Sequence, residues 1–205
     1  QQAYNYPDWG FSFLYHNPHN SILGENYGLH GHYNFYFFKR NLLFRVGSGI
    51  SYSSNPFDLE TNFKNNAYGS DILNSTYFLI NYNKQNIFKG FGLQAGLTLI
   101  HYSNANVRAP NSSTNTMAFN IGLHYELDQK ESPSLFKKSS FEAYSEPLKF
   151  NLMLRGGVNE SDFIGLGQHP FWIVSNFLDK RISYLSSLQF GTEVFFAKFL
   201  ISLIN

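Results

Sequence analysis

The sequence contains no cysteine among its 205 residues, which excludes a disulfide framework, a thiol nucleophile and a zinc site built from cysteines. It also lacks an excess of either charge, since 15 basic and 14 acidic side chains give a formal net charge of +1. Proteins that bind nucleic acid by neutralising phosphates carry a basic surplus, and no Lys/Arg-rich run occurs here. We therefore expect no nucleic-acid partner and no cofactor, and the chemistry must come from His, Ser, Asp or Glu.

Long hydrophobic runs are missing as well. No segment reaches the roughly 18 to 20 consecutive apolar residues that a membrane-spanning helix needs, and the mean hydropathy is −0.27. These two features exclude a helical membrane protein. The helix formers Ala, Glu and Lys are scarce, whereas aromatic residues make up 19% of the chain and charged residues only 14%. This composition favours β-strands, and a β-barrel is the membrane architecture that needs no long apolar run.

Apolar and polar residues alternate over several long segments, as expected for strands with one apolar and one polar face. In residues 117–127 the odd positions are apolar or aromatic, whereas the even positions include Asn120 and Glu126. The same split occurs in residues 27–37, 42–52, 148–155 and 181–196. Strands of a soluble sandwich average about five or six residues, whereas these longer runs match a tilted bilayer crossing.

We predict an all-β fold, an antiparallel transmembrane outer-membrane β-barrel, located in the bacterial outer membrane. About ten strands are expected, with roughly 8 to 14 left open, near residues 9–15, 26–38, 42–53, 72–84, 87–103, 115–127, 147–158, 170–178, 181–196 and 197–204. They form a single domain over residues 1–205. Because no signal segment precedes Gln1 and no aromatic residue ends the chain, we expect a processed form or a fragment of a longer barrel.

The alternation assigns side chains to two faces. The residues expected to face lipid are Phe44, Val46, Leu97, Leu99, Phe119 and Ile121. Those expected to face the lumen are Arg45, Gln94, Asn120 and Glu126. Ion pairs are expected within the polar interior among Arg45, Lys149, Arg155, Glu126 and Glu193. Residues 54–71, 104–114 and 128–146 are expected to be connections.

Two polar residues end the apolar stripe of the predicted strand that finishes near residue 103. The odd positions Leu97 and Leu99 are followed on the same face by His101 and Ser103. Side chains at i and i+2 of a strand lie roughly 6.5 to 7 Å apart, close enough for an imidazole to lean toward a hydroxyl and take its proton. A lipid-facing His and Ser pair suits a substrate that lies in the membrane. The alternative is that both residues only mark the interfacial end of the strand.

The stretch His101-Tyr102-Ser103-Asn104-Ala105, followed by Pro110-Asn111, resembles the signature of PagL-type lipid A 3-O-deacylases. These outer-membrane β-barrels hydrolyse an ester-linked acyl chain of lipopolysaccharide, and their pattern reads His-x-Ser-Asn-Ala, then Pro-Asn-x-Gly-x-Glu. The resemblance covers residues 42–127 most clearly. It implies that Ser103 is the nucleophile, His101 the base and Asn104 the oxyanion residue. It also implies lipid A, or lipopolysaccharide, and membrane lipids as partners.

The sequence departs from this pattern where the family has Gly and Glu, because Ser113 and Asn115 stand there. Asn115 shares the apolar face of the next predicted strand, so the geometry is kept while the carboxylate is lost. A neutral amide can orient an imidazole, but it cannot stabilise an imidazolium as an anion does, and replacing the acid of a serine triad costs about 10⁴ in kcat. No substitute is visible, since Glu126 has the opposite parity and Asp58 and Glu60 lie in another loop.

Three functions are compatible with these features. The first is a lipid A deacylase, favoured by His101, Ser103 and Asn104. The second is a catalytically impaired barrel that serves as a structural or accessory subunit of an outer-membrane protein complex, favoured by the lost carboxylate. The third is a diffusion pore, which would need a wide, clear lumen.

The other histidines give weaker signals. His30 and His32 share one strand face but have no carboxylate nearby, so a hydrated lumen pair is favoured over a metal site. His16 and His19 flank Pro18 in a predicted loop and indicate no site.

Overall fold

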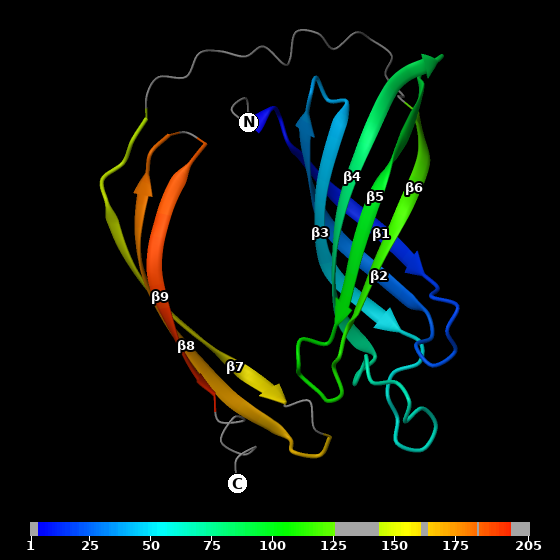
Figure 1. Ribbon diagram of the computed structural model, residues 1–205, viewed down its shortest axis with the longest axis vertical. Helices are drawn as coiled ribbons and strands as arrows, with labels where there is room; N and C mark the ends of the chain where they lie inside the picture. Colours follow the sequence, from blue (N-terminus) through cyan, green and yellow to red (C-terminus); the bar gives the residue numbers. More distant parts are fainter. Residues whose placement is uncertain (1–3, 126–143, 161–163, 184, 198–205) are drawn as a thin grey trace. The chain divides into compact units, whose positions relative to one another are not determined.

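The computed structural model describes residues 4–125, 144–160, 164–183 and 185–197, and its regular structure consists of antiparallel β-strands (Figure 1). No helix in these ranges is long and apolar enough to cross a membrane. The strands are β1 (Asp8–His16), β2 (Asn26–Phe37), β3 (Leu42–Ser53), β4 (Ile72–Phe88), β5 (Phe91–Ser103), β6 (Thr114–Tyr125), β7 (Lys149–Glu160), β8 (Gln168–Arg181) and β9 (Ser187–Ala197). The predicted all-β antiparallel class is confirmed.

The chain forms two compact units. The first holds a six-stranded sheet in which β1 to β6 pair with their sequence neighbours, together with most of the loops between them. The second holds a three-stranded sheet of β7, β8 and β9, and also residues 105–111. In both sheets each strand pairs antiparallel with the next one along the chain, which makes each sheet a meander.

The polar face of the six-stranded sheet is joined by hydrogen bonds between side chains of neighbouring strands. Arg45 Nε donates to Asn34 Oδ1 at 2.6 Å, Asn81 Nδ2 donates to Gln94 Oε1 at 3.3 Å, and Asn120 Nδ2 donates to Thr98 Oγ1 at 3.0 Å. These bonds confirm that Arg45, Gln94 and Asn120 share one face. Glu126, predicted to lie beside them, is outside the described residues.

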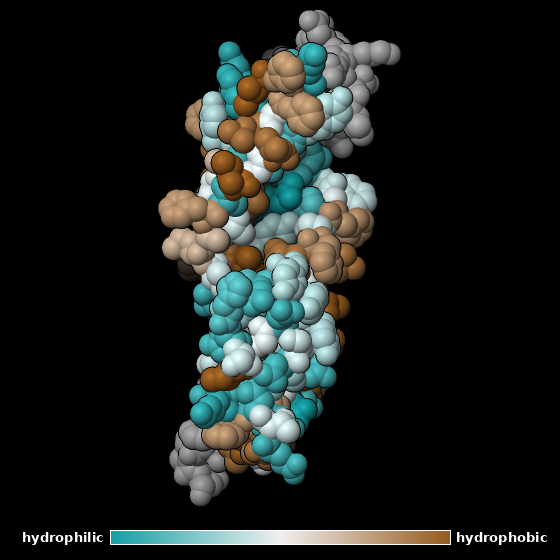
Figure 2. Space-filling view, turned by 90° about the vertical axis from the view of Figure 1, so that its right-hand side faces the viewer, coloured by the Kyte–Doolittle hydropathy of each residue, from teal (hydrophilic) through white to brown (hydrophobic). Residues whose placement is uncertain are grey.

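The opposite, apolar face is exposed. The ring of Phe44 lies between those of Phe35 and Phe78, with centroids 6.3 Å and 6.4 Å apart, while Phe119 is 90% exposed. The strand register places Phe44, Ile80, Leu97 and Phe119 in one row across four strands, and Val46, Phe78, Leu99 and Met117 in the next. In Figure 2 apolar side chains gather over the strands, and hydrophilic ones dominate toward the end that carries residues 54–71. The predicted separation of the two faces is therefore confirmed.

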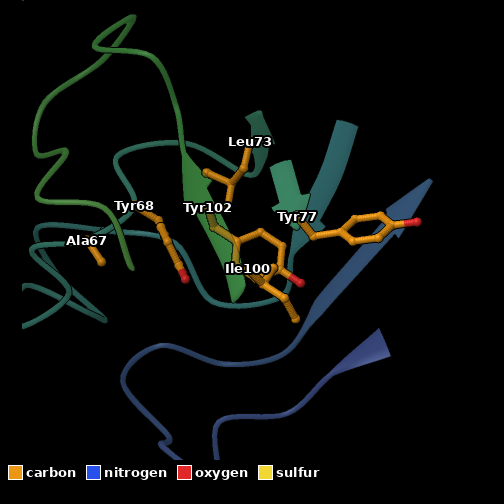
Figure 3. Packing of buried hydrophobic residues seen from close by; sticks show 6 residues of the cluster. All are labelled: Ala67, Tyr68, Leu73, Tyr77, Ile100 and Tyr102. Carbon is orange, nitrogen blue, oxygen red and sulfur yellow. The ribbon is translucent and has the colours of Figure 1, made fainter. Parts of the chain in front are cut away.

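The small hydrophobic core lies on the polar side of this sheet, near one end of the strands. It consists of Ala67, Tyr68, Leu73, Tyr77, Ile100 and Tyr102 (Figure 3). Tyr68 comes from the loop between β3 and β4, and its hydroxyl bonds with Thr114 and accepts from Asn26 Nδ2 at 3.4 Å. Burial raises the pKa of this phenol. A loop side chain thus fills the interior at this end.

The three-stranded sheet repeats the two-faced pattern. Arg155 and Glu193 form an ion pair, and Ser175 bonds with both at 2.8 Å, which confirms one of the pairings predicted for the polar interior. Lys149 pairs instead with Glu146, in the segment before β7. On the other face Leu152 and Phe190 are 71% and 80% exposed.

Two predicted turn positions are wrong. The β4–β5 turn lies at Lys89-Gly90 and not near residue 85, because both turn residues have positive φ and a register irregularity follows Lys84. The β8–β9 connection lies between Arg181 and Ser187, and Ile182 N donates to Ser186 O at 3.1 Å. Apolar alternation continues through this connection and conceals it. The strand predicted at residues 197–204 falls almost entirely outside the described residues.

Candidate active site

The site is built at the ends of two paired strands. His101 of β5 lies directly opposite Asn115 of β6 in the register, so both side chains project from the same face. His101 Nδ1 and Asn115 Oδ1 are 2.9 Å apart. Because an amide oxygen only accepts, Nδ1 is the donor in this contact, and in the neutral imidazole Nε2 is then the nitrogen with the lone pair. The structure thus joins two predicted site residues in the arrangement that prepares an imidazole to act as a base.

Ser103 ends β5 two residues after His101 and on the same face, opposite Asn74 of β4. Both His101 and Ser103 are partly exposed, whereas Asn104 directly after the strand is only 4% exposed. An imidazole and a hydroxyl are therefore accessible on the surface, and the residue that follows them is buried.

The surroundings of the pair change from apolar to polar at this point. Leu99 and Met117 face each other one step along the ladder, and they are 42% and 73% exposed. On the other side of His101, Thr76 lies opposite in β4, with Asn74 two residues before it. The site thus lies where an exposed apolar stripe meets polar side chains, a boundary suited to a substrate with an acyl chain and a polar head.

The connection that precedes β6 is held by the loop carrying Tyr68. Ser112 N and Oγ donate to Asn66 O at 3.0 Å and 2.9 Å, and Ser113 N donates to Ala67 O at 3.3 Å. Thr114 bonds with Tyr68 directly before Asn115. Sequence reasoning missed this support, because nothing in the residue pattern of 54–71 links that loop to β6.

Ser113 has a φ of 59°, in the left-handed region that favours glycine. This is the position where the family pattern has Gly. A serine thus stands in a backbone conformation that favours glycine.

The remaining candidates form no second site. His30 Nε2 lies 2.8 Å from Ser75 Oγ and His32 Nδ1 lies 3.3 Å from Ser12 Oγ, as expected for residues of the polar face. His16 stacks on Tyr102 with ring centroids 5.5 Å apart. Within the described ranges no group of three His, Asp or Glu side chains is placed to hold a metal ion.

The carboxylate of Asp58 accepts hydrogen bonds from its own loop. Asp58 Oδ1 accepts from the backbone N–H groups of Glu60 and Thr61 at 3.0 Å and 2.8 Å. The orienting partner that the structure gives His101 is the amide of Asn115.

Comparison with known proteins agrees with the motif. No curated protein and no solved structure matches the chain. A protein-family model described as lipid A 3-O-deacylase (PagL) matches residues 1–124, a range that contains β1 to β5, His101, Ser103, Asn104 and Asn115. Since this range is more than half of the 205 residues, the chain belongs to the PagL family of lipid A 3-O-deacylases, a family of outer-membrane β-barrels.

Proposed function

We propose that the protein is an outer-membrane hydrolase that removes an ester-linked acyl chain from lipid A, with Ser103 as nucleophile and His101 as general base. Asn115 orients the base and Asn104 supplies the oxyanion donor. The observation that carries this proposal is the 2.9 Å contact between His101 Nδ1 and Asn115 Oδ1. This contact leaves the basic nitrogen of His101 available for a serine on the same strand face.

The reaction follows the double-displacement chemistry of serine esterases. Ser103 Oγ attacks the ester carbonyl while His101 Nε2 takes its proton, and the tetrahedral oxyanion is stabilised at Asn104. The intermediate collapses to an acyl-Ser103 ester as the imidazolium protonates the departing lipid alkoxide. Water then attacks the acyl-enzyme with His101 again as base, which releases the fatty acid and restores the serine.

The exposed stripe beside the pair explains how such a substrate is presented. Leu99 and Met117 offer apolar surface next to His101, so an acyl chain can lie along the sheet within the bilayer. The ester at its polar end then meets His101 and Ser103 at the end of the strand. The substrate does not have to leave the membrane.

The test is acyl release from lipopolysaccharide by the purified protein, followed by mass spectrometry. Ser103→Ala should abolish release without unfolding the sheet. Ser48→Ala is the matched control, because Ser48 is exposed on the same face and lies two strands, about 10 Å, from His101. Full activity in Ser103→Ala would remove this serine from the mechanism.

A second function is favoured by one observation, the amide at position 115. With no anion beside it, the imidazolium formed during catalysis is poorly stabilised. In this alternative the protein is a structural or accessory subunit of an outer-membrane complex and has lost its activity. Inert wild-type protein, together with co-purification of defined outer-membrane partners, would favour this alternative over the deacylase.

A further inference from the structure

The segment that follows the motif is held by residues beyond the family match. Residues 105–111 continue directly from Asn104, and within their compact unit they contact the hairpin of β7 and β8. Glu160 Oε2 accepts from Ala109 N at 2.9 Å, and Glu160 N donates to Asn106 O at 2.7 Å. Gln168 Nε2 donates to Val107 O at 2.7 Å. Three backbone groups of residues 105–111 are thus hydrogen-bonded to Glu160 and Gln168, the last residue pair of the β7–β8 ladder.

Glu160 is unusual because it is a carboxylate at an apolar face. It directly opposes Gln168 at the end of the β7–β8 ladder and is only 9% exposed. A buried carboxylate is unfavourable unless hydrogen-bond donors compensate for its lost hydration. The N–H of Ala109 is such a donor, and hydrogen bonds to ionised acceptors are roughly twice as strong as neutral ones. The burial of the Glu160 carboxylate is therefore explained by its bond to residues 105–111.

The segment itself has a backbone that needs holding. Ala105 and Asn106 both have a φ of 56°, in the left-handed region that is unfavourable for alanine and better tolerated by asparagine. Asn111 Nδ2 donates to Asn106 Oδ1 at 2.5 Å. The path taken by the chain just after Asn104 therefore depends on outside contacts.

We propose that Glu160 is a positioning residue for the site: together with Gln168 it clamps residues 105–111 and so fixes the backbone that leaves Asn104. The C-terminal strands thereby act on the chemistry of the family-matched part of the chain. The clamp concerns residues 105–111 alone, whereas its effect on catalysis rests on the proposed deacylase function.

The clamp can be tested without any substrate, by limited trypsin digestion of the full-length protein in detergent. Arg108 is exposed, and the amide that trypsin would cleave after it is the Ala109 N–H bonded to Glu160. Glu160→Ala should raise the rate of cleavage at Arg108–Ala109 by about tenfold or more. Glu160→Gln keeps an acceptor oxygen and should restore most of the resistance.

Two further variants keep this test decisive. Glu193→Ala is the matched control, because that carboxylate bonds with Arg155 and Ser175, and its cleavage at Arg108 should equal that of the wild type. Gln168→Ala removes a different bond of the same clamp at an exposed residue and should accelerate cleavage even if Glu160→Ala fails to fold. Unchanged cleavage in both Gln168→Ala and a folded Glu160 variant would overturn the clamp.

Deacylation kinetics then test the effect on the site. Glu160→Ala should lower kcat by about 10- to 100-fold with little change in KM, because misplacing a reacting group costs rate more than binding, and Glu160→Gln should recover much of it. Faster cleavage with unchanged kcat would overturn the positioning role. If Glu160→Ala is cleaved faster and the wild type is inert toward lipid A, the result supports the clamp and contradicts the proposed function.

Discussion

The two sheets have the same alternating sequence pattern but differ in what fills their polar side. In the six-stranded unit, the loop between β3 and β4 places Tyr68 against Tyr102 and Leu73, and a compact core forms. In the described part of the three-stranded sheet only Ser175 and Glu160 are buried. Period-two alternation is therefore sufficient to make strands, whereas a filled interior needs a folded loop.

This difference coincides with the placement of the candidate site. The six-stranded unit carries the His101–Asn115 pair and is supported around it by residues 66–68. The three-stranded sheet contributes Glu160 and Gln168, which act on a neighbouring segment. The filled interior thus lies beside His101 and Asn115, whereas the proposed clamp holds the segment that follows Asn104.

The largest effect is expected from placing a carboxylate at position 115, where the family pattern has Glu. Asn115→Glu should raise deacylation by about 10² to 10⁴, because a carboxylate at the same register position would stabilise the imidazolium of His101. The measurement is the rate of acyl release from lipopolysaccharide, with Asn115→Gln as the matched neutral control. A fast wild type that Asn115→Glu slows would show that the amide is an adequate orienting group.

Emptying the core should have the next largest effect. Tyr68 is 1% exposed, so Tyr68→Ala should lower the free energy of unfolding by about 3 to 5 kcal/mol. Tyr68→Phe keeps the ring and loses only the hydroxyl bonds with Asn26 and Thr114, so about 1 kcal/mol is expected. Urea unfolding in lipid vesicles measures both. If Tyr68→Ala lowers the free energy of unfolding less than Tyr68→Phe does, the loop does not fill the interior.

A charge on each apolar face tests whether both sheets meet lipid. Phe119→Arg in β6 and Leu152→Arg in β7 should each cost about 2 to 4 kcal/mol if their positions lie near the bilayer midplane. The conservative variants Phe119→Leu and Leu152→Val control for lost volume. If Phe119→Arg lowers the free energy of unfolding and Leu152→Arg leaves it unchanged, the apolar face of the three-stranded sheet meets something other than lipid.

Sequence reasoning succeeded where one local rule decides the structure. Alternation was enough to find the strands, to separate Arg45 from Phe44, and to place Asn115 on the face of His101, since side-chain direction follows directly from parity. The residues Lys89 and Gly90 were missed as a turn because Lys89 has no turn preference of its own; the hairpin imposes its positive φ. The connection between Arg181 and Ser187 was hidden by continued alternation.

The contacts that support the site could not be predicted, because they join residues far apart in the chain. Tyr68 meets Thr114, and Glu160 meets Ala109. No periodic pattern connects these pairs, and a tyrosine or a glutamate at such positions is equally compatible with a solvated loop or strand end. The motif identified the candidate site residues, while the residues that hold them become evident only from the folded chain.

The smallest expected effect is at Ser113, the position where the family pattern has glycine. Its φ of 59° costs an L-residue roughly 1 to 2 kcal/mol, and Gly removes that strain but loses about 0.5 to 1 kcal/mol of backbone entropy. Ser113→Gly should therefore stabilise the six-stranded unit by up to about 1 kcal/mol, measured by urea unfolding. Ser113→Ala is the control, since it removes the hydroxyl and keeps the strain, so it should bring no gain. Equal stabilisation by both variants would attribute the effect to the hydroxyl and not to φ. Because Ser113 N bonds Ala67 O in the loop that carries Tyr68, any gain should vanish in the Tyr68→Ala background, where this loop no longer packs.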